Sequence, residues 1–205
     1  MNPTPGTGLI PIVEIFHSIQ GEGYFSGTPA VFIRLGGCDV GCHWCDEKNS
    51  WDKNNWPFVR VEKIVKETVK YPADIVVITG GEPLMHSLNE LTAGLRKAGK
   101  RTHLETSGAY PLSGRWDWIC LSPKKFMSPH NEIYRKTGEL KIIVYNKDDF
   151  RWAEEQAKKV SRKCKLFLQP EWSRKKAVLP VIVNYVQKFP EWRVSMQIHK
   201  YVQVK

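Results

Sequence analysis

The 205-residue chain has no apolar run that approaches the roughly 20 residues that a helix needs to cross a membrane. Its N-terminus lacks the basic and apolar segments of a secretory signal, so we expect neither a membrane protein nor a secreted one. Only five cysteines occur, and three of them are clustered. This favours metal binding in a reducing cytoplasm over a disulfide scaffold.

Acidic residues are also fewer than basic ones, 21 against 31, and the formal net charge is +10. The basic residues are dispersed, with small clusters only at 158–159, 162–165 and 174–176. The first two clusters lie on or just beyond a helical pattern, where a solvated face explains them. An anionic small substrate would profit from the same positive field, and we expect no direct nucleic-acid partner.

Apolar β-rich runs alternate with segments of helical periodicity along the chain. We expect strands at 30–35, 75–79, 102–105, 118–121, 140–145, 165–169 and 193–197, and helices at 61–70, 87–98, 148–160 and 176–189. Ser87 and Asp148 are candidate N-cap residues, and Pro180 predicts a helix that starts a residue or two after its pattern.

This alternation indicates an α/β protein with a mostly parallel sheet and right-handed crossovers. Residues 106–114 and 123–129 have no helical pattern, so we expect a partial (βα) barrel with fewer helices than strands. Residues 1–12 are expected to form a flexible lead and residues 13–205 a single domain. Residues 16–24 are expected to form a polar loop ahead of the first strong strand.

Cys38, Cys42 and Cys45 form a C-x3-C-x2-C motif within eight residues. A closed zinc site normally has four protein ligands, so a zinc site here would need His17 or His43 as well. A 4Fe–4S cluster also has four corners, and three cysteines leave one iron open to an exogenous ligand. The motif is the signature of radical S-adenosylmethionine (SAM) enzymes, whose cluster binds the methionine moiety of SAM at that iron.

The other two cysteines have no partner motif. Cys120 lies in an apolar strand and is expected to be a small core residue. Cys164 lies among basic residues and is expected to be a structural or surface thiol. We therefore expect no second cluster.

Polar sequences follow four of the expected strands, at 79–83, 105–108, 122–124 and 169–171. The carboxyl ends of parallel strands meet at one edge of a sheet, where ligands bind. Glycines at 80–81 would free main-chain groups for an amino-acid moiety, and Glu82 would orient its amino group or close the loop. Trp44 would pack against adenine, or serve as a structural tryptophan.

Arg34 lies within an apolar run, where an unpaired cation is costly. A substrate carboxylate held by the guanidinium fork would explain it, and an ion pair with Glu14 or Glu22 is the alternative. His199 is expected at the end of the last strand, where a lone histidine is usually structural.

Together these residues resemble the 7-carboxy-7-deazaguanine synthases, radical SAM enzymes of the queuosine and deazapurine pathway, from about residue 13 to residue 201. The matching motifs are Gln20-Gly21-Glu22-Gly23, Cys45-Asp46, Thr79-Gly80-Gly81-Glu82-Pro83, Glu105-Thr106-Ser107-Gly108, Ser122-Pro123-Lys124 and Gln197-Ile198-His199-Lys200. The resemblance implies a homodimer that holds a 4Fe–4S cluster, SAM and Mg²⁺, and a flavodoxin- or ferredoxin-type electron donor. The implied reaction converts 6-carboxy-5,6,7,8-tetrahydropterin to 7-carboxy-7-deazaguanine with loss of ammonia, and regenerates SAM.

The resemblance also implies roles for particular residues. The three clustered cysteines would hold the cluster, and the SAM site would comprise Trp44, Asp46, Gly80, Gly81, Glu82, Ser122, Pro123 and Lys124. The residues around the pterin would be Ile19, Gln20, Gly21, Glu22, Arg34, Thr79, Gln169 and His199. Among these, Glu22, Arg34 and His199 would be catalytic.

The chain departs from the family at one position, because Glu47 stands where a threonine usually binds Mg²⁺. A carboxylate is a competent Mg²⁺ ligand. Beside an anionic substrate, however, Glu47 requires a neighbouring cation, either the metal or a lysine such as Lys48 or Lys53.

Two other functions stay open at this point. One is a small radical SAM activase whose substrate is a protein. The other is a zinc-stabilised, basic RNA-binding module, although the chain has no aromatic-rich RNA-binding segment. Turnover of the carboxypterin would distinguish the synthase from the activase. Iron instead of zinc in the purified protein would exclude the RNA-binding module.

Overall fold

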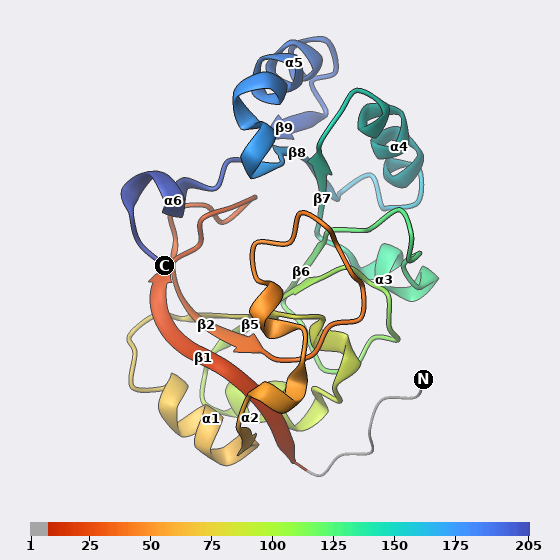
Figure 1. Cartoon of the computed structure of the whole chain (residues 1–205). Helices are drawn as coiled ribbons and strands as arrows, with labels where there is room; N and C mark the ends of the chain where they lie inside the picture. Colours follow the sequence, from red (N-terminus) through yellow and green to blue (C-terminus); the bar gives the residue numbers. More distant parts are fainter. Residues whose placement is uncertain (1–7) are drawn as a thin grey trace.

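The computed structural model describes residues 8–205, which form one sheet of nine strands in the order β3-β1-β2-β4-β5-β6-β7-β8-β9. The sheet forms a partial barrel. It is not closed, because the strands at its two ends, β3 and β9, do not pair with each other. Figure 1 shows β1 and β2 at one end of this sheet and β7, β8 and β9 at the other.

One edge of the sheet is antiparallel. There, β1 (Leu9–Ile19) pairs with β2 (Pro29–Leu35) and with the short β3 (Phe58–Arg60). Neither β1 nor β3 was predicted. Residues 9–12 therefore belong to the sheet and not to a lead, and residues 16–19 extend a strand instead of forming a loop. Residues 1–7 of the expected lead lie outside the described residues.

The remaining strands continue from β2 in parallel. They are β4 (Ile75–Gly80), β5 (Arg101–Thr106), β6 (Trp118–Leu121), β7 (Glu139–Val144), β8 (Lys165–Pro170) and β9 (Trp192–Val194). All seven predicted strands are present, and only the last is displaced, ending at Val194 instead of residue 197. The parallel order places the carboxyl ends of these strands along one edge.

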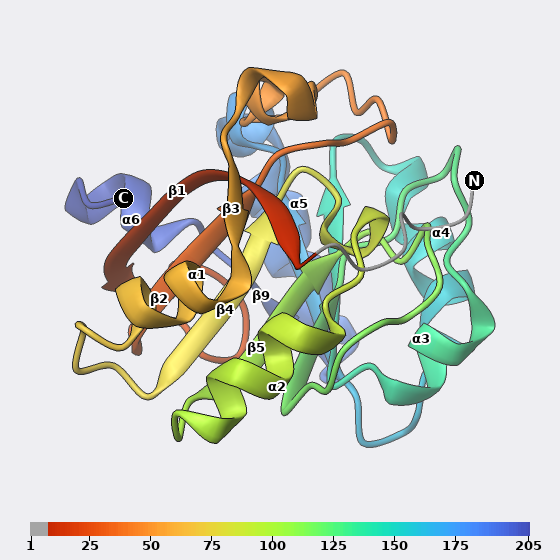
Figure 2. The ribbon, with the colours of Figure 1, turned by 90° about the horizontal axis from the view of Figure 1, so that it is seen from below.

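Six α-helices occur within residues 8–205, so the helices are fewer than the strands, as predicted. They are α1 (Val61–Thr68), α2 (Asn89–Lys97), α3 (Asn131–Lys136), α4 (Asp148–Ala157), α5 (Lys175–Lys188) and α6 (Ile198–Val202). Figure 2 shows α1 and α2 side by side beneath the strands. The short helices α3 and α6 were not predicted, and His199 lies in α6 and not at a strand end. No helix of the described part is long and apolar enough to span a membrane.

The predicted helix starts need correction. Leu88, and not Ser87, precedes α2, and Asp148 is the first residue of α4 and makes no capping bond. The helix α5 begins at Lys175 and contains Pro180 in its second turn. The proline removes one main-chain donor. Ile182, two residues later, is fully buried, and its packing against the core stabilises the helix across the proline.

Side chains of β7 alternate between the two faces of the sheet and illustrate how the core and the site are separated. Leu140, Ile142 and Val144 are fully buried in the apolar core under the helices. Glu139 and Lys141 alternate with them and are also buried, but on the inner face of the partial barrel. On this strand the inner face is therefore charged, and it lines two of the pockets.

Candidate active site

Two adjacent pockets open on the inner face of the sheet. The first, which we call the cysteine pocket, is lined by Cys38, Cys42 and Cys45, by the ends of β4, β5 and β6, and by Lys141 and Gln169. The second, which we call the β1 pocket, has a volume of about 400 Å³ and lies beside the end of β1. Both pockets are lined by Glu22, Thr79, Glu105 and Gln197, so they share one wall.

The loop after β2 places all three clustered cysteines in the cysteine pocket. Main-chain bonds fix this loop, since the N–H of Gly37 donates to Ser50 O (2.6 Å) and the N–H of Cys38 donates to Trp51 O (2.9 Å). Burial raises the pKa of Cys38 to about 11, and it also raises the pKa of Cys42. A bound cation is therefore needed to keep these groups as thiolates.

The donor set fits a cluster better than a single ion. Within residues 8–205, no three His, Cys, Asp or Glu side chains converge closely enough to hold one metal ion. Around zinc, three sulfurs would have to meet at about 2.3 Å from a common centre. All three cysteines line one pocket, and three thiolates are the protein ligands that a 4Fe–4S cluster needs when SAM occupies its fourth iron.

The two isolated cysteines do not belong to this loop, and both are buried. Cys120 is buried, and it also lines the cysteine pocket, where its thiol lies 3.5 Å from Glu139 Oε1. Burial, followed by the nearby Glu139 carboxylate, raises the pKa of Cys120 well above its usual value. Cys164 is buried near the opposite end of the strands, beside Leu166.

The glycines after β4 are required by close packing against the cysteine loop. A Cβ on Gly80, which has a φ of +113°, would lie 2.4 Å from Leu35 N. A Cβ on Gly81 would lie 2.1 Å from Gly37 O. Both clashes are with backbone, so neither position accepts a side chain without moving the loop.

Glu82 closes the loop, which is the second of its two predicted roles. Its side chain is 1% exposed and accepts hydrogen bonds from Thr106 Oγ1 (2.5 Å), Ser107 Oγ (2.5 Å), Ser107 N (2.8 Å) and Leu84 N (3.1 Å). The carboxylate thereby ties the end of β4 to the end of β5. It still forms part of the pocket wall.

The other predicted SAM residues surround the same pocket, with one exception. Lys124 Nζ donates to Ser122 O (2.6 Å) and Ser122 Oγ (2.8 Å), and burial lowers the pKa of Lys124. Trp44 stacks near Tyr145, with 6.4 Å between ring centroids. Pro123 is buried and does not line the pocket.

Asp46 connects the cysteine loop to the C-terminal segment. Its Oδ2 accepts hydrogen bonds from Lys200 Nζ (2.6 Å) and Gln197 Nε2 (3.1 Å). Burial alone would raise the pKa of Asp46, but these two partners lower it below its usual value. Asp46 lines both pockets.

Seven of the eight residues predicted around the pterin line the β1 pocket: Ile19, Gln20, Gly21, Glu22, Arg34, Thr79 and His199. Gln169 does not. It lines the cysteine pocket, where its Oε1 accepts a hydrogen bond from Ser195 Oγ (2.7 Å). His199 packs so closely on Gly21 that a Cβ there would lie 1.9 Å from His199 Nδ1.

Arg34 forms the ion pair that was the alternative to a substrate contact. Its Nε lies 3.0 Å from Glu14 Oε1 and 3.8 Å from Glu47 Oε2. Burial would raise the pKa of Glu14, but Lys205 and Arg34 together lower it. The cation that accompanies Glu47 is therefore Arg34, and neither Lys48 nor Lys53 takes that place among the described ion pairs.

Two charged residues of the site had no predicted role, although Glu105 belongs to one of the strand-end motifs. Glu105 accepts hydrogen bonds from Thr79 Oγ1 (2.8 Å) and Gln20 Nε2 (3.0 Å), and lies in the wall that the pockets share. Lys141 forms an ion pair with Glu22. The signal for Lys141 was present in the sequence, because it is a cation in an apolar run, as Arg34 is.

Known proteins are similar to this chain along the part that forms the two pockets. A model of the Radical SAM superfamily matches residues 32–121. The 7-carboxy-7-deazaguanine synthase of Flavobacterium psychrophilum is 53% identical over 196 residues, which cover 96% of this chain and 93% of the relative. The synthase of the same name from Escherichia coli is 34% identical over 221 residues, covering 95% and 98%.

A solved structure agrees with these relatives. The crystal structure of QueE from Escherichia coli superposes with a TM-score of 0.83 at 32% sequence identity. The match covers 92% of this chain and 93% of that chain. The similarity therefore extends across both pockets and not only across the cysteine motif.

Proposed function

The chain belongs to the 7-carboxy-7-deazaguanine synthase family, and we propose that it is a radical SAM lyase that forms 7-carboxy-7-deazaguanine from 6-carboxy-5,6,7,8-tetrahydropterin. Loss of ammonia accounts for the whole difference in composition between substrate and product, so no external oxidant is consumed. The observation that carries the proposal is the shared wall between the cysteine pocket and the β1 pocket. The activase and the RNA-binding module are not favoured, since the relatives match over nearly the full chain.

The cysteine pocket is the proposed cofactor site. Cys38, Cys42 and Cys45 would hold the 4Fe–4S cluster, and the main chain at 80–81 with Ser122 and Lys124 would hold SAM. When bound, the cluster and SAM supply a carbon radical that takes a hydrogen atom from the substrate. The protein contributes a buried pocket that keeps water away from that radical.

The β1 pocket is the proposed pterin site. Arg34 is held at Nε by Glu14, so its two terminal nitrogens can bind the substrate carboxylate as a fork. Gln20, Thr79 and Glu105 offer fixed polar contacts for the ring edges. Glu22 and His199 lie where they can orient the substrate and move a proton to the departing ammonia.

Mg²⁺ would bind at Glu47, whose carboxylate lines the β1 pocket. The ion keeps several waters and takes few carboxylates, so one carboxylate together with substrate oxygens is a competent set. Arg34, 3.8 Å away, would share in neutralising Glu47. The homodimer, the flavodoxin- or ferredoxin-type donor and the cytoplasmic location stay predictions.

The test is anaerobic incubation of the purified, reconstituted protein with the carboxypterin, SAM and a reductant, followed by mass analysis. We expect a product that has lost ammonia, at substoichiometric SAM. Cleavage of SAM without conversion of the pterin would contradict the proposed substrate and return the activase to consideration. A colourless protein that contains zinc would contradict the whole proposal.

A further inference from the structure

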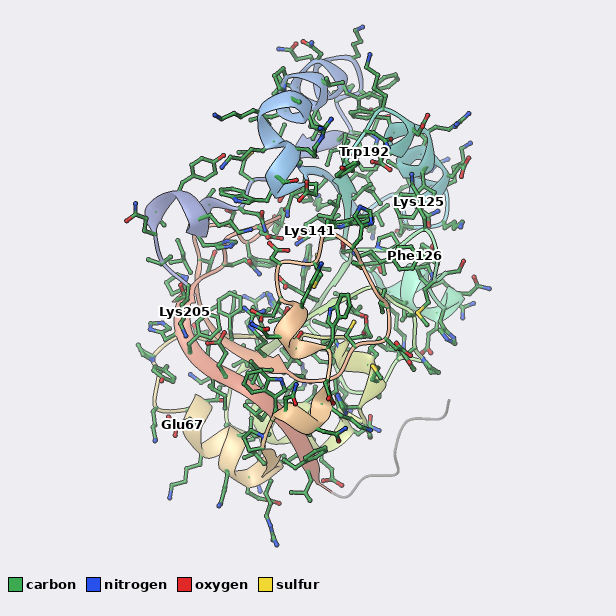
Figure 3. All side chains as sticks on the ribbon, in the orientation of Figure 1. Glu67, Lys125, Phe126, Lys141, Trp192 and Lys205 are labelled. Atoms are coloured by element: carbon green, nitrogen blue, oxygen red, sulfur yellow. The ribbon has the colours of Figure 1, made fainter. Side chains whose placement is uncertain are left out.

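Lys141 is a buried cation beside the active site, and the proposed reaction gives it no role so far. Its side chain is 7% exposed and forms an ion pair with Glu22. Figure 3 shows Lys141 near the middle of the molecule, while the labelled Lys205 lies at its edge. Because a buried ammonium is costly unless it is paired, the contact with Glu22 is what makes this lysine tolerable.

Glu22 is fixed on both of its carboxylate oxygens. Its Oε2 faces Lys141 Nζ, and its Oε1 accepts a hydrogen bond from Gln197 Nε2 (2.8 Å). Its main-chain N–H donates to Gln20 Oε1 (3.1 Å), so the Gln20 side chain is held against the main chain at Glu22. Glu22 lines the cysteine pocket and the β1 pocket, where the cofactor and the pterin are proposed to meet.

The charges of the pair support each other. Burial alone would raise the pKa of Glu22, but the Lys141 ammonium lowers it below its usual value. Burial alone would lower the pKa of Lys141, but Glu22 and other nearby acidic groups raise it well above its usual value. Both groups are therefore charged across the neutral range.

The same strand also holds the chain that follows Glu22. Glu139, two residues before Lys141 on β7, accepts a hydrogen bond from Tyr24 N (3.0 Å). Gly23 packs directly on this carboxylate, since a Cβ there would lie 1.8 Å from Glu139 Oε1. The segment 20–24 thus lies against two inward-facing side chains of β7.

We propose that Lys141 is a positioning residue for the reaction, which holds the Glu22 carboxylate and the segment 20–23 in place against the pterin. This inference rests on the proposed function. Lys141 lines the cysteine pocket but not the β1 pocket, so it acts on the substrate through Glu22 and not by contact.

The experiment compares Lys141→Met, Glu22→Gln and the double variant with the natural protein. Methionine keeps the length of the lysine stem and removes its charge. The readouts are iron content, SAM cleavage, product formed per SAM cleaved, and the temperature of unfolding. Gln156→Leu is the control, because Gln156 of α4 is a buried polar residue that is hydrogen-bonded to Tyr134 of α3 and lies outside both pockets.

We expect Lys141→Met to retain iron and SAM cleavage but to lose product formation by about 100-fold, as for a misplaced catalytic group. Glu22→Gln should lose a similar factor, and the double variant no more than the worse single one. Lys141→Met should also unfold at a lower temperature, since it leaves Glu22 unpaired. The double variant should recover that temperature without recovering product. Gln156→Leu should lower only the unfolding temperature.

Three results would overturn the inference. One is product formation by Lys141→Met at the natural rate. The second is a loss in the double variant equal to the two single fold-losses multiplied together, which would mean that Lys141 acts independently of Glu22. The third is recovery of product in the double variant along with its unfolding temperature, which would make the pair purely structural.

Where Lys141→Met does not fold, Lys141→Gln is measured in its place, because glutamine is a neutral polar side chain that is too short to hold Glu22 in the same position. Lost product with normal SAM cleavage then supports the inference, and normal product opposes it. Failure of the natural protein to convert the pterin would instead contradict the proposed function, which keeps the two failures distinct.

Discussion

The two pockets of this site share a wall but are built in different ways. The cysteine pocket is shaped mainly by main-chain bonds and by backbone packing, with Gly81 pressed against Gly37 O. The β1 pocket is shaped by charged side chains, notably Arg34 with Glu14, and Glu22, which Lys141 pairs with from the side of the cysteine pocket. The first pocket should therefore respond to changes of shape and the second to changes of charge.

The largest effect is expected from the cysteines of the loop. Replacing Cys38, Cys42 or Cys45 singly by alanine should abolish SAM cleavage, because an iron of the cluster would lose its only protein ligand. Iron content and anaerobic SAM cleavage measure this. The control replaces Cys120 and Cys164 together by alanine and should leave about four iron atoms per chain. Loss of the cluster from that control would show that the assignment of ligands is wrong.

A large effect of another kind is expected at Arg34. Losing a buried, charge-assisted pair with the substrate carboxylate costs about 2–5 kcal/mol, so Arg34→Ala should lower kcat/KM by roughly thirty-fold or more. Arg34→Lys should recover only part of this, since it lacks the fork. SAM cleavage without substrate should be unchanged in both.

Glu14 provides the matched comparison for Arg34, because it fixes Arg34 Nε at 3.0 Å. Glu14→Gln should keep the guanidinium but loosen it, and should therefore raise KM less than Arg34→Ala does. If Arg34→Ala lowered the unfolding temperature but left pterin binding and turnover unchanged, the arginine would be structural, as the ion pair alone would suggest.

The sequence predicted which residues belong to the site better than it predicted which side chains they contact. The strand-end motifs predicted one edge, and seven of the eight proposed pterin residues do line one pocket. Gln169 lies in the other pocket because β8 is separated from β1 by five intervening strands, an order that periodicity cannot reveal. Arg34 was correctly singled out as a cation that needs a partner, but only the register of β1 against β2, with Glu14 opposite Arg34, selects that partner.

The antiparallel edge was the main omission in the fold. Strand β1 contains Pro11, Glu14 and His17, which weaken its apolar alternation. It is stabilised by pairing on both sides, with β2 and with β3, and that support is tertiary. The helix α6 was missed for a different reason, since its five residues are too few to show a helical pattern.

A moderate effect is expected from Mg²⁺. Chelation should lower turnover by about tenfold, equivalent to about 1.4 kcal/mol, because Arg34 would still offset part of the charge on Glu47. Activity against Mg²⁺ concentration measures this for the natural protein and for Glu47→Thr. Glu47→Thr should stay metal-dependent, since a hydroxyl can also bind the ion. Full activity of the natural protein in chelator would mean that Arg34 alone neutralises Glu47.

The smallest effect is expected at Lys200, whose Nζ lies 2.6 Å from Asp46 Oδ2. This pair joins the cysteine loop to α6, and it is less buried than the Glu22–Lys141 pair, since the Asp46 side chain is 58% exposed. Exposed pairs contribute about 0–1 kcal/mol and are screened by salt, so Lys200→Met should lower kcat/KM by less than about fivefold.

The comparison of Lys200→Met with Lys141→Met at low and high salt tests whether burial sets the order of these two effects. The small loss in Lys200→Met should vanish at high salt, because salt already weakens that pair in the natural protein. The loss in Lys141→Met should persist, because the buried pair is poorly screened. Equal losses that respond equally to salt would mean that the exposed and the buried ion pair contribute alike to turnover. Burial of the Glu22–Lys141 pair would then have no special consequence.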